Sequence, residues 1–206
     1  MDQNAFYTAA VQEPRTILGL RLQPLSLGHI LLMNRVGSAF LSGDPLRYED
    51  LAVSVFICAN KYADAVQALD DPGLSRSMLR WSQTLTRTRP IDRLLRRKPR
   101  PIEFTAKATA FRDYLRQGSW HPDFHSKGDG GNTIEAPPEH LIRITLMREL
   151  GISESEIMDR SWSQCLTDFY LLRALDGSIN IVDNAEIEEM LKKVEASFAK
   201  HNANHP

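Results

Sequence analysis

Apolar residues recur at three- and four-residue steps over several stretches of the chain, which is the period of an amphipathic helix. The clearest stretch opens at Asp44 and Pro45 and ends at the helix-breaking residues 70–73. Its periodic apolar positions are Leu51, Val55, Cys58, Tyr62, Val66 and Leu69. Further apolar residues make its first half apolar on nearly every side. The pattern predicts one central helix of the core.

Shorter helices are predicted on both sides of this stretch. Ser26 can cap a helix over 27–36, which Gly37 ends. Two later apolar stripes predict further helices. The first stripe, over 74–86, consists of Leu74, Met78, Trp81 and Leu85. The second belongs to a helix that Gly118 ends, and it consists of Phe104, Ala108, Phe111 and Leu115. Prolines at 90, 99 and 101 limit residues 91–97 to about two helical turns.

The C-terminal third carries explicit helix start and stop signals. A helix that follows Pro137 and Pro138 ends at Gly151. Two later helix starts have the capping-box spacing, in which two side chains satisfy each other's free amides; the pairs are Ser153 with Glu156 and Ser161 with Gln164. The second of these helices ends at Gly177. Three helices in succession are therefore expected.

A last helix is predicted over 183–200, with charged flanks and a narrow apolar stripe. The stripe consists of Ile187, Met190 or Leu191, Val194 and Phe198. Such a helix suits docking against a partner or a second copy of the chain, but it also suits packing on its own domain. The sequence leaves both interpretations open.

Extended structure is expected in only two places. Residues 16–22, between Pro14 and Pro24, predict a short strand or arm, and residues 178–182 are β-prone and could pair with it. The predicted class is mainly α, with about seven helices in two packed subdomains and at most one short two-stranded β element. We expect an N-terminal helical subdomain over 1–118, a flexible loop over 119–138 and a C-terminal helical subdomain over 139–206.

Charge is distributed unevenly along the 206 residues, although the formal net charge is only -1. Between Arg76 and Arg100 there are nine Lys or Arg residues against one acid, Asp92. We call residues 76–100 the Arg-rich segment. Its field would attract an acidic protein or nucleic-acid partner, although a solvated surface is the plainer interpretation. The residues that we expect to contact a partner are Arg87, Arg89, Arg93, Arg96, Arg97, Lys98, Arg100, Ile187, Leu191, Val194 and Phe198.

Few signs of chemistry accompany these surfaces. His121 and His125 are metal-ligand types, but Pro122 disfavours a helix there and no fourth ligand has a standard spacing. The glycine-rich run 128–131 lacks the Lys-Ser/Thr end of a phosphate-binding loop. No catalytic motif is visible, so we expect no enzyme, no cofactor and no bound metal, although a metal-dependent enzyme around the two histidines stays open.

The expected environment is the cytoplasm. The N-terminus lacks a secretory signal pattern, and the longest apolar stretch, 51–59, is far shorter than the ~20 residues that cross a bilayer. Cys58 and Cys165 both fall on apolar helix faces, where a free thiol packs as a small hydrophobe. A disulfide between them is the alternative.

Two stretches resemble a known group of proteins. They are 18–62, with GLRLQPLSLGHILLMNRVGSAFL and DLAVSVFICANKY, and 137–182, with PPEHLIRITLMRELGISESEIMDRSWSQCLTDFYLLRAL. They resemble small helical proteins of phage and prophage tail-morphogenesis modules, including tail assembly chaperones. The resemblance implies a non-enzymatic protein that keeps a tail component, such as the tape measure protein, soluble in the host cytoplasm until assembly. It transfers no functional residues. The alternative is a nucleic-acid-associated protein whose Arg-rich segment contacts backbone phosphates.

Overall fold

The computed structural model of the chain describes residues 12–71, 73, 76, 101–121, 124–126 and 136–181. The mainly helical class is confirmed. Eight helices lie in the described residues: α2 (Leu27–Arg35), α3 (Ala39–Ser42), α4 (Tyr48–Ala59), α5 (Tyr62–Asp70), α8 (Pro101–Gly118), α9 (Pro138–Leu150), α10 (Glu154–Asp159) and α11 (Trp162–Leu175). Four short strands form two antiparallel pairs, β1 (Thr16–Ile17) with β2 (Leu20–Arg21) and β3 (Phe124–Ser126) with β4 (Ile179–Ile181). The sequence predicted at most one such pair.

The first strand pair is a tight hairpin and not the single strand expected over 16–22. Leu18 and Gly19 turn the chain with φ angles of 53° and 80°, the left-handed conformation that a two-residue hairpin turn of this kind requires. The segment before the hairpin is fastened to α8, because the Gln12 side-chain amide donates to the Tyr114 carbonyl at 2.8 Å and accepts from the Leu25 amide at 2.7 Å. The N-terminal segment therefore lies along α8.

The predicted central helix is in fact two helices, α4 and α5. The chain leaves the helical conformation at Asn60 and Lys61, whose ψ angles are 158° and 156°. The Asn60 side chain donates to the Phe56 carbonyl at 2.8 Å, and its own backbone carbonyl pairs with the ring of His29 at 2.8 Å. The apolar period continues across Asn60 and Lys61, so the spacing of apolar residues gives no sign of the break. The break coincides instead with the contact between Asn60 and His29 of α2.

Helices α2 and α8 largely follow their predicted bounds. Ser26 caps α2, which ends before the positive φ of Gly37. Helix α8 starts earlier than its apolar stripe, at Pro101, and buries Phe111 and Tyr114. Its last residue, Gly118, allows a close approach to Leu25, because a Cβ added there would lie 2.5 Å from the Leu25 Cβ. The short helix α3 has no counterpart among the predicted elements.

In the C-terminal part the first capping box forms and the second does not. Gly151 ends α9 in the left-handed conformation, and the Ser153–Glu156 box starts α10. Helix α11 starts after Ser161 as predicted, but the Ser161 side chain makes no capping bond. Instead, its backbone bridges to Ser26, and the Trp162 amide donates to the Leu25 carbonyl at 2.7 Å. Pairing with a distant segment takes the place of the local cap.

The second strand pair corrects two predictions. Strand β4 pairs with β3, and not with residues 16–22, in the register Phe124 to Ile181 and Ser126 to Ile179. Strand β3 also lies inside the stretch 119–138 that was expected to be a loop.

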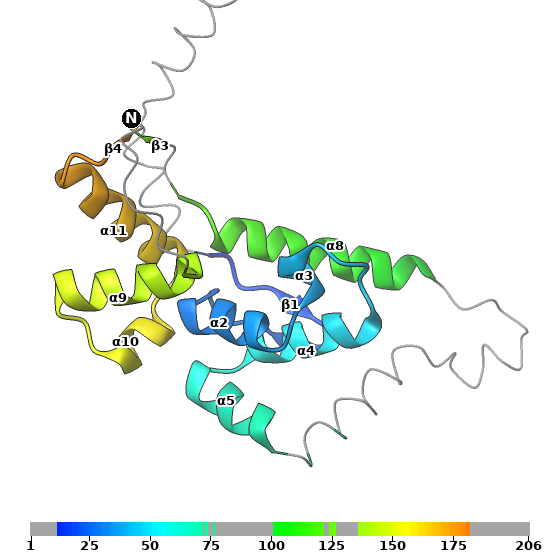
Figure 1. Cartoon of the computed structure of the whole chain (residues 1–206). Helices are drawn as coiled ribbons and strands as arrows, with labels where there is room; N and C mark the ends of the chain where they lie inside the picture. The colour runs from blue at the N-terminus through cyan, green and yellow to red at the C-terminus, as the bar shows by residue number, and fades with distance from the viewer. Residues whose placement is uncertain are drawn as a thin grey trace, which may run out of the picture.

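Core side chains from both parts of the chain lie in one cluster, which α2 helps to join. Helix α2 contacts α4 and α5 on one side and α9, α10 and α11 on the other, an arrangement visible in Figure 1. The largest fully buried side chains of this cluster include Phe111, Tyr114, Leu146 and Ile157. The division into 1–118 and 139–206 stays a prediction, but the described halves share their core. Within the described residues, no helix is long and apolar enough to cross a membrane.

Candidate partner-binding surfaces

All the residues predicted to contact a partner lie outside the described residues. They are Arg87, Arg89, Arg93, Arg96, Arg97, Lys98, Arg100, Ile187, Leu191, Val194 and Phe198. The glycine-rich run 128–131 lies outside them as well. These predictions stand as they were, and the described part of the chain offers other surfaces.

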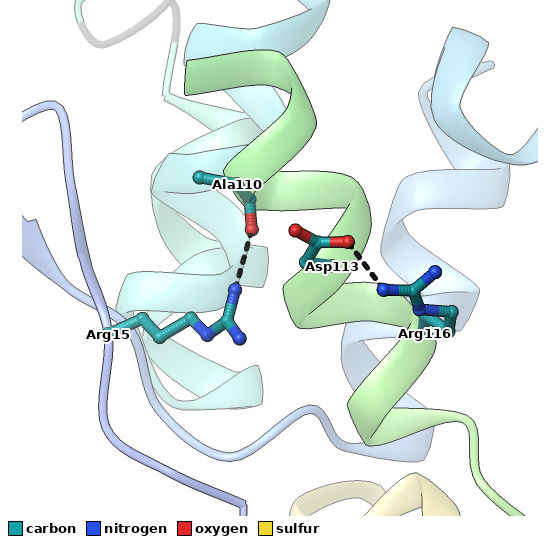
Figure 2. Close-up of polar contacts among 4 residues, drawn as sticks. All are labelled: Arg15, Ala110, Asp113 and Arg116. Carbon is teal, nitrogen blue, oxygen red and sulfur yellow. Dashed lines mark hydrogen bonds and ion pairs between the residues drawn. The ribbon is translucent and has the colours of Figure 1, made fainter. Parts of the chain in front are cut away.

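Helix α8 begins directly after the Arg-rich segment and carries three bases, Lys107, Arg112 and Arg116, against two acids. Figure 2 shows how Arg15 reaches from the N-terminal segment to donate to the Ala110 carbonyl at 3.2 Å. Beside it, Arg116 pairs with Asp113 at 2.8 Å, with 81% of the Arg116 side chain exposed. An exposed pair of this kind contributes little stability. Because most of the Arg116 side chain is exposed, its guanidinium is accessible to solvent.

Part of the compensating negative charge lies on α5 and α10. These two helices meet where the Tyr62 amide donates to the Asp159 carboxylate at 3.2 Å. In Figure 1 both helices lie below α8. Exposed acids on or beside them are Asp64, Asp70, Asp71, Glu154, Glu156 and Asp159. Two of these acids are paired with basic side chains, Asp70 with Arg35 at 2.7 Å and Glu154 with Arg143 at 3.0 Å.

Helices α9 and α11 carry most of the large apolar side chains that are exposed among the described residues. Among the described residues six large hydrophobic side chains are exposed, and four of them belong to these two helices: Ile144, Leu150, Leu171 and Leu175. Leu175 stands out with 84% of its surface exposed. The two helices pack against each other, and both run toward the same side of the molecule in Figure 1.

A buried polar junction lies at the start of α2. The Ser26 hydroxyl accepts from the His29 amide at 3.3 Å, and the Ser26 amide donates to His29 Nδ1 at 3.1 Å. The His29 ring is only 2% exposed, and its Nε2 lies 2.8 Å from the Asn60 carbonyl. Burial lowers the pKa of His29 below its ordinary value of 6.5, an effect that outweighs the Asn60 carbonyl and the Asp159 carboxylate, which raise it.

The same junction is tightly packed. A Cβ added at Gly28 would lie 2.5 Å from Cδ2 of Tyr62 and 2.7 Å from the Met158 carbonyl. Backbone bonds extend the junction, because the Leu27 amide donates to the Arg160 carbonyl at 3.2 Å. The sequence identified Ser26 as the cap of this helix but gave no role to His29, because the capping-box pattern names Glu or Gln at that position and not His.

The described residues hold no evident reactive centre. Cys58 and Cys165 are both buried free thiols, so no disulfide joins them. Burial raises the pKa of each thiol to about 12, which keeps both protonated and unreactive at neutral pH. The Tyr114 hydroxyl donates to the Gln23 carbonyl at 2.8 Å, and burial raises its pKa.

The two histidines considered as metal ligands serve other contacts. The His121 ring lies 5.1 Å from the Tyr170 ring, and His125 belongs to β3, where its backbone pairs with Asn180. Within the part of the chain that the structure describes, no group of three or more His, Cys, Asp or Glu side chains could hold a metal ion.

Comparison with known proteins adds no relative: no family model, no curated protein and no solved structure matches the chain.

Proposed function

We propose that the chain is a non-enzymatic assembly protein that binds another protein, in the manner of the phage tail assembly chaperones that its sequence resembles. The observation that carries the proposal is the exposed apolar surface of α9 and α11, with Leu175 84% exposed at the end of α11. Apolar side chains left in water favour contact with an apolar partner surface. The partner proposed is an aggregation-prone tail component, the tape measure protein.

The Arg-rich segment provides the second part of the proposed contact. Its nine bases against one acid favour an acidic stretch of the partner, which guanidinium groups bind through paired hydrogen bonds. Replacing Arg87, Arg89, Arg93, Arg96, Arg97, Lys98 and Arg100 together by Gln should weaken binding and leave the thermal unfolding midpoint unchanged. Undiminished binding by this variant would contradict a role for the segment.

The test of the apolar surface is co-expression with a phage tape measure protein, followed by measurement of Kd for the purified pair. Changing Leu150 and Leu175 together to Ser should raise Kd at least about tenfold, because truncation of apolar anchors costs more than about 1 kcal/mol each. The matched control changes Val36 and Leu41 to Ser, since these side chains are exposed to 40% and 37% elsewhere on the surface. Equal Kd values for the two variants would contradict the proposed surface.

One observation favours a second candidate, which is contact with nucleic acid through the Arg-rich segment. Binding to duplex DNA phosphates weakens steeply with salt, with a slope near 0.9 per neutralised phosphate on logarithmic axes. A contact made through apolar helices changes little over the same range. A salt titration of the purified chain with duplex DNA therefore separates the two functions. Tight, salt-sensitive DNA binding without binding to a tail protein would replace the leading proposal.

A further inference from the structure

The helix start at α2 is closed by a titratable side chain, the imidazole of His29. His29 occupies the position where a capping box ordinarily carries Glu or Gln. Its Nδ1 atom accepts from the Ser26 amide at 3.1 Å, while its own amide donates to the Ser26 hydroxyl at 3.3 Å. Histidine is the side chain whose ordinary pKa lies near neutral pH, so the closing bond depends on pH.

The hydrogen-bond partners define the state of the ring. The Ser26 amide can only donate, so Nδ1 carries no proton and the neutral ring has its proton on Nε2. That proton is donated to the Asn60 carbonyl at 2.8 Å. Asn60 is the residue at which α4 ends before α5 begins. One neutral ring therefore holds the start of α2 against the break between α4 and α5.

A second proton would disrupt this arrangement. It can bind only at Nδ1, where it would face the N–H of Ser26, and two donors repel each other. The positive ring would also lie in the first turn of α2, where the helix dipole disfavours a cation. On the opposing elements, α10 supplies the Asp159 carboxylate, which stabilises the charged ring, and α5 supplies the Tyr62 ring, which packs at Gly28. Burial of the ring outweighs the help of Asp159.

The direction of the pH effect follows from the lowered pKa. The unfolded chain takes up a proton at His29 near pH 6.5, whereas the folded chain resists it until a lower pH. The stability that the neutral ring contributes is therefore complete above pH 6.5. It is lost as the pH falls from 6.5 toward the lower pKa of the folded state.

We propose that His29 is a pH-sensitive latch, which fastens the start of α2 to the α4–α5 break near neutral pH and releases it on acidification. Release would reach beyond α2. The neighbouring amides of Leu27 and Trp162 join the same segment to the connection between α10 and α11, through the Arg160 and Leu25 carbonyls. Loss of the latch therefore loosens the place where the two parts of the chain meet.

The test compares the full chain with its His29→Gln variant. Glutamine can accept from the Ser26 amide as in an ordinary capping box, but it does not titrate. Urea unfolding between pH 8 and 5 should show the folding equilibrium constant of the wild type falling, relative to the variant, by up to about tenfold per pH unit below 6.5. His140→Gln is the matched control, because it removes another helical histidine and should keep the wild-type dependence. If the ratio of the folding equilibrium constants of the wild type and His29→Gln stayed constant across this range, the latch would be overturned.

A second measurement uses the wild type alone, in case His29→Gln does not fold. Nitrogen NMR of the ring and of the backbone follows protonation and release together. The latch requires the ring to bind its second proton below pH 6.5. The amide signals of Ser26 and Lys61 should shift at the same time, because the ring contacts the Ser26 amide and the Asn60 carbonyl, which shares its peptide group with the Lys61 amide. A ring that titrates near pH 6.5 while both amide signals stay fixed would overturn it.

Discussion

Among the described helices, two begin with a serine whose side chain and backbone bond to the third residue of the helix, but the two starts differ in chemistry. At α2 the pair is Ser26 and His29, both buried. At α10 the pair is Ser153 and Glu156, both exposed, with the Ser153 amide donating to the carboxylate at 3.2 Å. A neutral ring closes the first start and a charged carboxylate closes the second.

Because of this difference, the two helix starts lose stability over different ranges of pH. The side-chain and backbone hydrogen bonds of Ser153 lower the pKa of Glu156 below its ordinary value of 4.5, because they stabilise the charged form. Burial lowers the pKa of His29 below 6.5, because it disfavours the charged form. Both closures hold at neutral pH, and on acidification the stability that the buried one contributes begins to decline at the higher pH, near 6.5 and not near 4.5. The same spacing thus yields a different response according to where the fold places it.

The largest difference between the two starts should come from the second residue of each helix. In Gly28→Ala the new Cβ would lie 2.5 Å from the Tyr62 ring and 2.7 Å from the Met158 carbonyl, so overpacking should reduce the free energy of unfolding by about 1–3 kcal/mol. Ser155→Ala changes the equivalent, exposed position of α10 and should stay within about 0.5 kcal/mol. Urea unfolding at pH 7.5 measures both. If both variants lost the same free energy of unfolding, packing would not distinguish the start of α2 from the start of α10.

The capping serines should differ less. Ser26→Ala removes the acceptor of a buried amide, so its cost should be near the upper end of the range for lost caps, about 2 kcal/mol. Ser153→Ala removes the acceptor of the Glu156 amide, which lies at an exposed residue and can bond to water instead, so the change should cost about 0.5–1 kcal/mol. The comparison uses thermal unfolding of both variants at neutral pH. If Ser153→Ala cost as much as Ser26→Ala, burial would not be the deciding factor.

The smallest effect should come from the exposed carboxylate. Because the pKa of Glu156 is lowered in the folded state, its contribution is present above pH 4.5 and declines as the pH falls below that value. Glu156→Gln should remove this part of the acid dependence and leave stability between pH 6 and 8 nearly unchanged. Unfolding curves from pH 6 to 3 check this. A change centred near pH 6.5 would contradict the assignment of that range to His29.

The elements that sequence predicts well are those with local signals. Ser26 and Gly37 bracket α2, and Gly151 and Ser153 mark the end of α9 and the start of α10. In each case the residue makes or permits a backbone bond within a few positions. Its effect can therefore be deduced without knowledge of the rest of the fold.

The elements that sequence misses depend on distant partners. The break after α4 coincides with the His29–Asn60 contact, which joins residues 31 positions apart. Strand β4 pairs with β3, far earlier in the chain, and Ser161 bridges to Ser26. Periodicity cannot reveal which of several apolar or extended segments will meet.

The candidate surfaces show the same limit. Apolar spacing indicates which face of α11 lies toward the core, as the burial of Cys165 and Leu166 bears out. It does not indicate whether another element covers Leu171 and Leu175. The predicted contact residues in the Arg-rich segment and over 187–198 stay predictions, since they lie outside the described residues.

The backbone bonds between the segments around Leu25 and Trp162 suggest a practical use for the molecule. Each half supplies side chains that cover apolar surface of the other half and exclude water from it. Separate genes for residues 1–127 and 128–206 should therefore yield soluble material only when expressed together. Each fragment could then be fused to half of a reporter, whose signal would report reassembly in living cells.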